Sequence, residues 1–216
     1  DCMREYTDPT NIRRFHIQGI SCPKCGPKVW LATTDGEKIE VDDPITEAAK
    51  LVDEGYIIAV KGLGGFHIAA LATDDDVVLK LRKRKRRRYK PFALMALDIE
   101  VAQQIVEIDN KAREVLESPE KPIVLLPEKE DSPVSKYVAP GLDKQGVMLP
   151  YTPLHYLLLK DTRDKFLIMT SGNKKGKPMC TDEQCAITRL GGIVDFFLFH
   201  NRRIINRVDD SVVRFT

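Results

Sequence analysis

The sequence predicts an α/β fold built on a mixed β-sheet with flanking helices, because short apolar runs of strand length alternate with amphipathic segments along the chain. The composition agrees, since 43% of the residues are hydrophobic and 31% are charged, as in an ordinary globular domain. The length of 216 residues suits one domain and an appendage. The sequence shows neither a signal peptide nor an apolar run near the roughly 20 residues of a membrane span, so we expect a cytoplasmic chain.

The appendage is expected at the N-terminus, because residues 1–27 carry three of the five cysteines. Cys22 and Cys25 are separated by two residues, a spacing that lets both thiolates reach one tetrahedral zinc ion. Cys2 lies upstream within the range of a third ligand, and His16 is available as a fourth. A free, reduced pair of cysteines is the alternative. An odd number of cysteines without secretory features favours metal over disulfides.

A hairpin, a helix and a strand are expected next. Residues 29–42 are expected to form a hairpin, with the polar residues 34–37 as its turn. Asp43 and Pro44 start a helix that ends at Gly55, because aspartate caps a helix and proline suits its first turn. The apolar residues 56–60 then form a strand.

The strongest functional signal lies between residues 61 and 97. Lys61 follows the strand and opens a glycine turn, and a helix capped by Thr73 or Asp74 comes after it. This helix runs into seven consecutive basic residues, 82–88, before Pro91 stops it and the next strand begins. A glycine turn and a dense cationic loop both suit the binding of a polyanion such as a nucleoside triphosphate.

Nucleotide binding is only one of the functions that this stretch allows. The glycine turn lacks both the Rossmann spacing and the ending of a phosphate loop. A basic run is usually a solvated face or a nucleic-acid patch. The net charge of only +2 means that acidic residues elsewhere offset the run. Charge alone therefore leaves nucleotide, nucleic acid and no ligand equally possible.

The rest of the chain continues the alternation of helices and strands. A polar stretch at residues 127–146 is expected to be a loop. Strands are expected at residues 92–97, 122–126, 166–169, 195–200 and 212–215. Helices are expected at residues 98–107, 110–117 and 181–190, and at a segment ending at residue 160 that Thr152 caps.

Two polar segments lie next to predicted strands. The turn at residues 170–173 is rich in hydroxyl, amide and N–H groups that can hold phosphate, ribose or a small carbonyl acid, although an ordinary polar turn has the same composition. Asp209 and Asp210 can orient magnesium or hold a basic loop, and a salt-bridged strand end is the alternative. His67 and His155 fit a structural role as well as a direct one.

Several segments, in order, resemble one known family. They are SCPKCGP at residues 21–27, KGLGGFH at 61–67, RKRRRYKPFALM at 84–95, MLPYTPLH at 148–155, MTSGN at 169–173, and HNR at 200–202 followed by RVDDSVVR at 207–214. Together they resemble the YrdC-like domain of the HypF family, the hydrogenase-maturation carbamoyltransferases. The resemblance covers essentially the whole chain and implies a YrdC-like twisted mixed sheet with flanking helices at residues 31–216. Residues 1–30 would be the C-terminal part of a zinc-finger unit, whose missing ligand would precede Asp1.

The resemblance also implies site residues. The superfamily's Lys-x-Arg…Lys pattern for ATP phosphates matches Lys85, Arg87 and Lys90, although Arg88 stands where proline is commoner. Lys61 would join Lys85 and Arg87 in catalysis, and the other basic residues would face solvent or a neighbouring domain. Further nucleotide contacts would come from Thr170, Ser171, Asn173, Arg207 and Ser211, and Zn²⁺ would be bound by Cys2, Cys22 and Cys25.

The reaction that the resemblance implies is the Mg²⁺-dependent joining of carbamate and ATP to give carbamoyl-adenylate and pyrophosphate. An acylphosphatase domain would release carbamate from carbamoyl phosphate. Another domain would pass the carbamoyl group to the C-terminal cysteine of a partner protein, feeding the cyanide ligands of nickel–iron hydrogenase.

Two other functions compete with this one. Threonylcarbamoyl-adenylate synthesis for tRNA modification uses the same fold, but Met148 stands where that branch has an arginine. A non-catalytic nucleic-acid-binding module is less expected, because only Tyr89 and Phe92 are available for stacking near the run.

Overall fold

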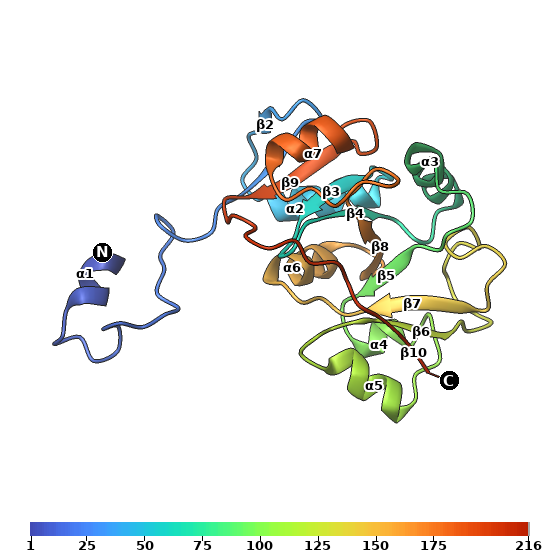
Figure 1. Cartoon of the computed structure of the whole chain (residues 1–216), viewed down its shortest axis with the longest axis horizontal. Helices are drawn as coiled ribbons and strands as arrows, with labels where there is room; N and C mark the ends of the chain where they lie inside the picture. Colours follow the sequence, from blue (N-terminus) through green and yellow to red (C-terminus); the bar gives the residue numbers. More distant parts are fainter. Residues whose placement is uncertain (216) are drawn as a thin grey trace.

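The computed structural model describes residues 1–215, and an extended segment joins a small N-terminal unit to a larger α/β body (Figure 1). The strands of the body are β1 (Val29–Ala32), β2 (Lys38–Ile39), β3 (Ile58–Lys61), β4 (Phe66–Ala70), β5 (Ala93–Ala96), β6 (Ile123–Pro127), β7 (Lys144–Met148), β8 (Phe166–Ser171), β9 (Phe196–His200) and β10 (Val212–Arg214). They form one sheet in the order β10-β6-β7-β5-β8-β4-β3-β9-β1-β2. Parallel and antiparallel neighbours both occur, which confirms the expected mixed sheet.

The helices begin at residues that can cap them. They are α1 (Cys2–Thr7), α2 (Pro44–Asp53), α3 (Asp75–Lys85), α4 (Ile99–Ala102), α5 (Asn110–Glu117), α6 (Pro153–Asp161) and α7 (Glu183–Leu190). Each helix of the body follows an aspartate or threonine whose side chain accepts a backbone N–H of the first turn. Asp74 caps α3, whereas the hydroxyl of Thr73 donates to Asp164 instead. No helix within residues 1–215 is both long and apolar enough to cross a membrane.

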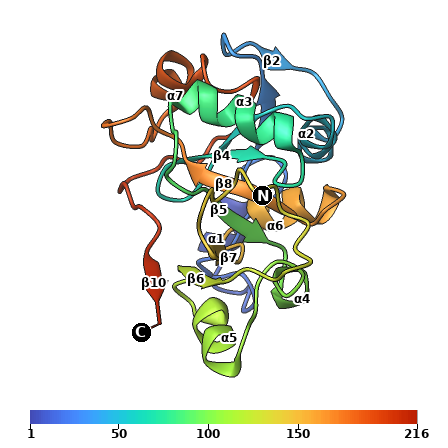
Figure 2. The ribbon, with the colours of Figure 1, turned by 90° about the vertical axis from the view of Figure 1, so that its right-hand side faces the viewer.

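The helices are spread along the sheet. Both views place α4 and α5 near β6 and β10, α7 near β2, and α6 beside the middle strands (Figure 1 and Figure 2), and α3 contacts β4. Between them, β3 and β4 are buried along their whole length, and the side chain of Phe66 is fully enclosed. The candidate site lies where these buried central strands end.

The end of β3, the start of β4 and the end of β8 lie together there. The glycine turn, residues 62–65, joins β3 to β4 as a hairpin, since Lys61 pairs with Phe66. His67 on β4 pairs with Ser171 on β8, so the glycine turn and the turn at residues 170–173 are neighbours. The approach is close, because a Cβ added to Gly172 would lie 2.6 Å from the Phe66 carbonyl oxygen.

Residues 201–211, which we call the strap, run between β9 and β10 without helix or strand and cross the body as an extended trace (Figure 1). The Val208 amide donates to the Gly64 carbonyl at 3.1 Å. A Cβ at Gly64 would lie 2.6 Å from the Val208 carbonyl oxygen, so glycine is required where the strap crosses the turn.

The structure corrects three expectations about elements. The segment after the glycine turn is the strand β4, which was missed because it is buried on both faces and shows no alternation. The expected loop at residues 127–146 ends inside the strand β7. The expected helix at residues 98–107 is only the short helix α4, after which Val106 bridges to Glu128.

Candidate functional site

The basic run turns at the end of α3 and points its side chains in different directions. Arg86 adopts a left-handed conformation with φ of 50° and ends the helix. Lys85, the last helical residue, is buried, and its Nζ donates to the Ser171 carbonyl at 2.6 Å and to the Asn173 carbonyl at 3.4 Å. The lysine therefore ties the end of α3 to the turn that follows β8.

Arg87 is held on the same side of that turn. Its Nη1 donates to the Thr170 hydroxyl at 2.9 Å, its Nε donates to the Lys90 carbonyl at 3.0 Å, and its Nη2 donates to the Pro91 carbonyl. The guanidinium also stacks over the Phe92 ring, 4.8 Å from its centroid. These contacts fix the guanidinium rather than leaving it free in solvent.

The two cations are close together and partly removed from water. Burial, with the neighbouring charges of Arg87 and Lys90, lowers the pKa of Lys85 to about 7. Burial and the charge of Arg82 lower the pKa of Arg87 to about 10. Both pKa shifts show that the site disfavours its own positive charge, so an anionic ligand would be stabilised there.

A cavity of about 720 Å³, which we call the basic cavity, opens beside these residues. Its volume lies within the usual range for small-molecule and cofactor sites. It is lined by Lys85, Arg86, Arg87, Arg88, Tyr89, Lys90, Ser171, Asn173, Lys175 and Gly176. The structure thus brings together five of the residues predicted to contact ATP, with Thr170 bonded to Arg87 behind them.

Arg82 contradicts the expectation that the other basic residues face solvent or another domain. It is only 7% exposed, and its guanidinium donates to the carbonyl groups of Tyr137, Val138, Arg87 and Arg88. This arginine holds the shape of the basic loop from inside. No pattern in the sequence indicates this role, because Arg82 looks like any other member of the run.

Lys61 lies apart from the basic cavity. It is buried, and its Nζ donates to Glu183 Oε1 at 2.6 Å and to the His200 carbonyl at 3.0 Å. It lines a different, mostly apolar cavity of about 370 Å³. Its charge is therefore matched by a protein carboxylate.

Arg207 and Ser211 belong to the strap. The Arg207 Nε donates to the Met179 carbonyl at 2.9 Å, which fastens the strap to the loop before α7. Ser211 lines another cavity of about 510 Å³, which we call the strap cavity, together with Tyr151, Asp209 and Asp210. Neither Arg207 nor Ser211 is among the residues that line the basic cavity.

Asp210 is held by two side chains from other segments. His67 Nε2 lies 2.9 Å from Asp210 Oδ2, and the Tyr151 hydroxyl donates to Asp210 Oδ1 at 3.0 Å. Burial favours the protonated acid, but the bonds from His67 and Tyr151 outweigh it and hold the pKa of Asp210 below its ordinary value. His155 packs beside them, fully buried, and neither of its ring nitrogens bonds to a described residue.

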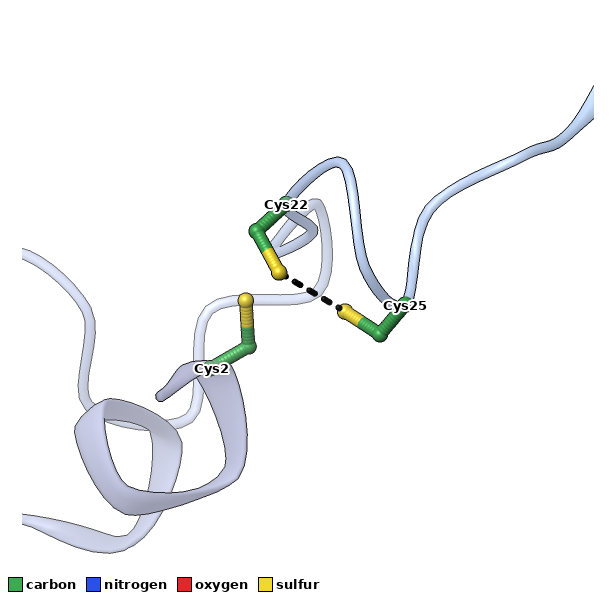
Figure 3. Close-up of side chains that lie close together, drawn as sticks. All are labelled: Cys2, Cys22 and Cys25. Carbon is green, nitrogen blue, oxygen red and sulfur yellow. Dashed lines mark hydrogen bonds between the residues drawn. The ribbon is translucent and has the colours of Figure 1, made fainter.

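The cysteines of the N-terminal unit converge on one point (Figure 3). The sulfur atoms of Cys2, Cys22 and Cys25 all lie within 4.8 Å of one another, and those of Cys22 and Cys25 are 3.6 Å apart. Thiolates bound tetrahedrally at about 2.3 Å from zinc would be about 3.8 Å apart, so the three sulfur atoms fit one zinc ion. Backbone N–H groups, chiefly that of Cys25, lower the pKa of Cys22 to about 7, which favours its thiolate. His16 instead stacks on Tyr6, with ring centroids 4.9 Å apart.

The two remaining cysteines correct the expectation of metal rather than disulfides. Cys180 and Cys185 form a disulfide between the loop after β8 and the first turn of α7. Cys180 is fully buried, and its amide donates to the Gly172 carbonyl. The sequence did not predict this pair because a five-residue separation matches no common metal or redox motif.

Comparison with known proteins gives two family matches. Residues 50–216 match the Sua5/YciO/YrdC family, described as "Telomere recombination". Residues 1–32 match the HypF finger. The first match covers most of the body, including both turns, the basic run and the strap.

Curated relatives match almost the whole chain. It is 49% identical to the carbamoyltransferase HypF of Rhodobacter capsulatus over 213 residues, which are 99% of the chain and 28% of that relative. It is 48% identical to the probable carbamoyltransferase HypF of Methanocaldococcus jannaschii, again over 99% of the chain and over 34% of the relative. The chain therefore spans about a third or less of the length of these relatives.

Solved structures agree with this assignment. The structure of T. kodakarensis HypF matches with a TM-score of 0.90 and 45% identity, over 99% of the chain and 28% of that structure. A full-length HypF in a phosphate- and nucleotide-bound form matches with a TM-score of 0.88 and 44% identity, with the same coverage. P. abyssi Sua5 complexed with L-threonine, at 21% identity and a TM-score of 0.71 over 80% of the chain and 51% of that structure, shares the fold. The chain belongs to the Sua5/YciO/YrdC family and joins that family's domain to a HypF finger, as the HypF carbamoyltransferases do.

Proposed function

We propose that the body binds ATP in the basic cavity and joins its AMP part to carbamate, forming carbamoyl-adenylate and pyrophosphate. The observation that carries this proposal is the convergence of Lys85, Arg87 and Lys90 with the turn at residues 170–173 on one cavity of about 720 Å³. The nucleotide-bound form of a full-length HypF, 44% identical to this chain, supports the choice of ligand.

The reaction brings an anion to a polyanion. A carboxylate oxygen of carbamate attacks the α-phosphorus, the bond to the β-phosphate oxygen breaks, and pyrophosphate leaves with the electron pair. Fixed cations at Lys85 and Arg87 reduce the repulsion and stabilise the charge that grows on the leaving group. Lys90 and the side chains of Ser171 and Asn173 would hold the phosphates and the nucleoside. When bound, Mg²⁺ would neutralise phosphate charge in the same cavity.

Lys61, Arg207 and Ser211 have supporting parts in this proposal. Lys61 is bonded to Glu183 and would fix the glycine turn against α7 rather than contact phosphate. Arg207 would fasten the strap, and Ser211 would face the smaller substrate in the strap cavity. We divide the chain into the finger part at residues 1–30 and the nucleotide-binding domain at residues 31–216.

The finger part would hold one zinc ion through Cys2, Cys22 and Cys25. A bound zinc ion would crosslink the ends of a unit that has few buried apolar residues of its own. The wider process follows from the relatives, which are named carbamoyltransferases. We propose that carbamate comes from carbamoyl phosphate through an acylphosphatase domain. A further domain would pass the carbamoyl group to the C-terminal cysteine of a hydrogenase-maturation partner.

The exchange of labelled pyrophosphate into ATP tests this function. We expect exchange with carbamoyl phosphate plus an added acylphosphatase, and none with threonine plus bicarbonate. Exchange with threonine alone would favour threonylcarbamoyl-adenylate synthesis instead. RNA binding without any exchange would contradict both enzymatic functions.

Substitutions in the basic run test where the phosphates lie. Lys85→Ala or Arg87→Ala should weaken ATP binding at least tenfold, because each removes a charge-assisted contact worth more than about 1.4 kcal/mol. Lys83→Ala is the matched control, since Lys83 is an exposed residue of the same run that does not line the basic cavity. Equal ATP dissociation constants in all three variants, measured by titration calorimetry, would show that the phosphates bind elsewhere.

A further inference from the structure

A hydrogen-bond acceptor, the carboxylate of Asp210, lines the strap cavity. His67 comes from β4, Tyr151 from the loop before α6, and Asp210 from the strap, so three segments distant in sequence meet there. We call these three residues the Asp210 cluster. The Asp210 side chain is 18% exposed, and that of His67 is 2% exposed. Asp210 and Tyr151 both line the cavity, and the imidazole lies behind them.

The cluster fixes the orientation of the carboxylate and leaves part of it free. One oxygen of Asp210 contacts His67 at 2.9 Å, and the other accepts from Tyr151 at 3.0 Å. A carboxylate has about four acceptor positions, so each oxygen can take another hydrogen bond. The pKa of Asp210 lies below its ordinary value, because the bonds from His67 and Tyr151 outweigh burial. The pKa of Tyr151 is raised by burial and by the charge of Asp210, so the phenol stays a donor.

An ionised carboxylate accepts hydrogen bonds and donates none. It therefore recognises a ligand through N–H or O–H groups. Donors lie around the same cavity, because Lys121, Arg203 and Ser211 also line it. A cavity that is lined by a fixed acceptor and by cationic and hydroxyl donors suits a small molecule with an amino group at one end and a carboxylate at the other.

We propose that Asp210 is the specificity-determining residue for carbamate, accepting a hydrogen bond from its amino group, with His67 and Tyr151 as positioning residues. This assignment rests on the proposed function, since carbamate is the small substrate of that reaction. Acetate has a methyl group where carbamate has its amino group and offers no donor. A site built to accept an N–H bond rejects such an analogue, because the acceptor is then left unpaired.

Asp210→Asn tests this role with little change of shape. Asparagine can still accept from Tyr151 and bond to His67, so the strap keeps its anchor while the negative charge is lost. The KM for carbamate in pyrophosphate exchange should rise about tenfold, and the inhibition constant of acetate should change less than twofold. The dissociation constant of ATP, measured separately, should not change.

Two further variants complete the test. Asp35→Asn removes the same charge from an exposed aspartate that lines none of the cavities described above, and should change the KM for carbamate less than twofold. Tyr151→Phe removes one bond to the carboxylate but keeps its charge, so it should raise that KM by a smaller factor than Asp210→Asn.

The outcomes separate this assignment from the proposed function. An unchanged KM for carbamate in Asp210→Asn, with normal exchange in the unmodified chain, would overturn the assignment alone. Equal changes in the KM for carbamate and in the inhibition constant of acetate would show that Asp210 only anchors the strap. This result would also overturn the assignment. No exchange with carbamate in the unmodified chain would overturn the proposed function and this assignment together.

Discussion

Single residues of the basic run have separate physical environments despite their identical charge. Arg82 is buried against five backbone carbonyl groups, which act as its counter-charge. Lys85 and Arg87 are also withdrawn from solvent, but Lys85 reaches only two carbonyl groups and lies beside a second cation. The run is tolerated because its members are divided between the loop interior, the cavity wall and solvent. Of these three environments, only that of the residues lining the basic cavity is stabilised by an anionic ligand.

The pH dependence of ATP binding follows from Lys85. Its pKa of about 7 in the free protein should rise when a triphosphate binds, so binding above pH 7 must take up a proton. The ATP affinity should therefore be highest below pH 7 and should fall as the pH rises from 7 to 9, by at most tenfold per unit. Titration calorimetry in two buffers of different ionisation enthalpy at pH 8 measures the proton uptake.

Lys85→Arg is the control for this prediction. A guanidinium stays protonated throughout this range, so the variant should bind ATP with little pH dependence and take up less than half as many protons. An affinity that is constant between pH 7 and 9 in the unmodified chain would show that Lys85 is already charged in the free protein.

Elements were predictable from sequence where local chemistry decides them. The cap at Asp43 and the choice of Thr73 or Asp74 for the next helix depend on neighbouring residues, and the structure has Asp43 and Asp74 as caps. The closeness of Cys22 and Cys25 likewise follows from their spacing in the sequence. The strand β4 was not predictable from its pattern, because burial on both faces removes the alternation. The placement of Ser211 in another cavity was also not predictable, since it depends on where the strap crosses Gly64.

The disulfide between Cys180 and Cys185 should stabilise the body. It closes a short loop, for which chain entropy predicts about 2 kcal/mol. Cys185→Ser should lower the free energy of unfolding by about this amount, as should reductant acting on the unmodified chain. The variant itself should not respond to reductant. Urea unfolding with and without reductant provides the measurement.

A thiol count gives an independent check of the same bond. Cys2, Cys22 and Cys25 are the free cysteines of the chain, so the denatured, metal-free protein should show three reactive thiols before reduction and five after it. Five thiols without reductant, together with an unfolding curve that reductant does not move, would contradict the disulfide.

Three of the four histidines of the chain, His67, His155 and His200, lie around the glycine turn and the strap once the molecule is folded. His155 is the most enclosed of them, with its ring centroid 4.8 Å from that of Tyr151 and 5.5 Å from that of His67. Folding of the body thus encloses an imidazole that bonds to no other described residue. The stability of the whole fold should depend on this group's remaining neutral.

Acid should therefore destabilise the protein through His155. Burial, with the charge of His67, lowers its pKa from 6.5 to about 3 in the folded state. Between these values the unfolded chain binds a proton that the folded chain does not, so stability falls as the pH drops below 6.5 and is unaffected by this group above it. The loss is at most about 1.4 kcal/mol per pH unit, or about 2 kcal/mol at pH 5.

His155→Phe keeps an aromatic ring and removes the two enclosed nitrogens, so its stability should fall less steeply on acidification. Urea unfolding at pH 7, 6 and 5 gives the slopes, and the carboxylates common to both proteins cancel in the difference. His16→Phe, in the N-terminal unit, should keep the slope of the unmodified chain. Parallel slopes for the unmodified chain and His155→Phe would mean that His155 accepts a proton in the folded state. In that case the contact between α6 and the sheet would contain a charged imidazolium.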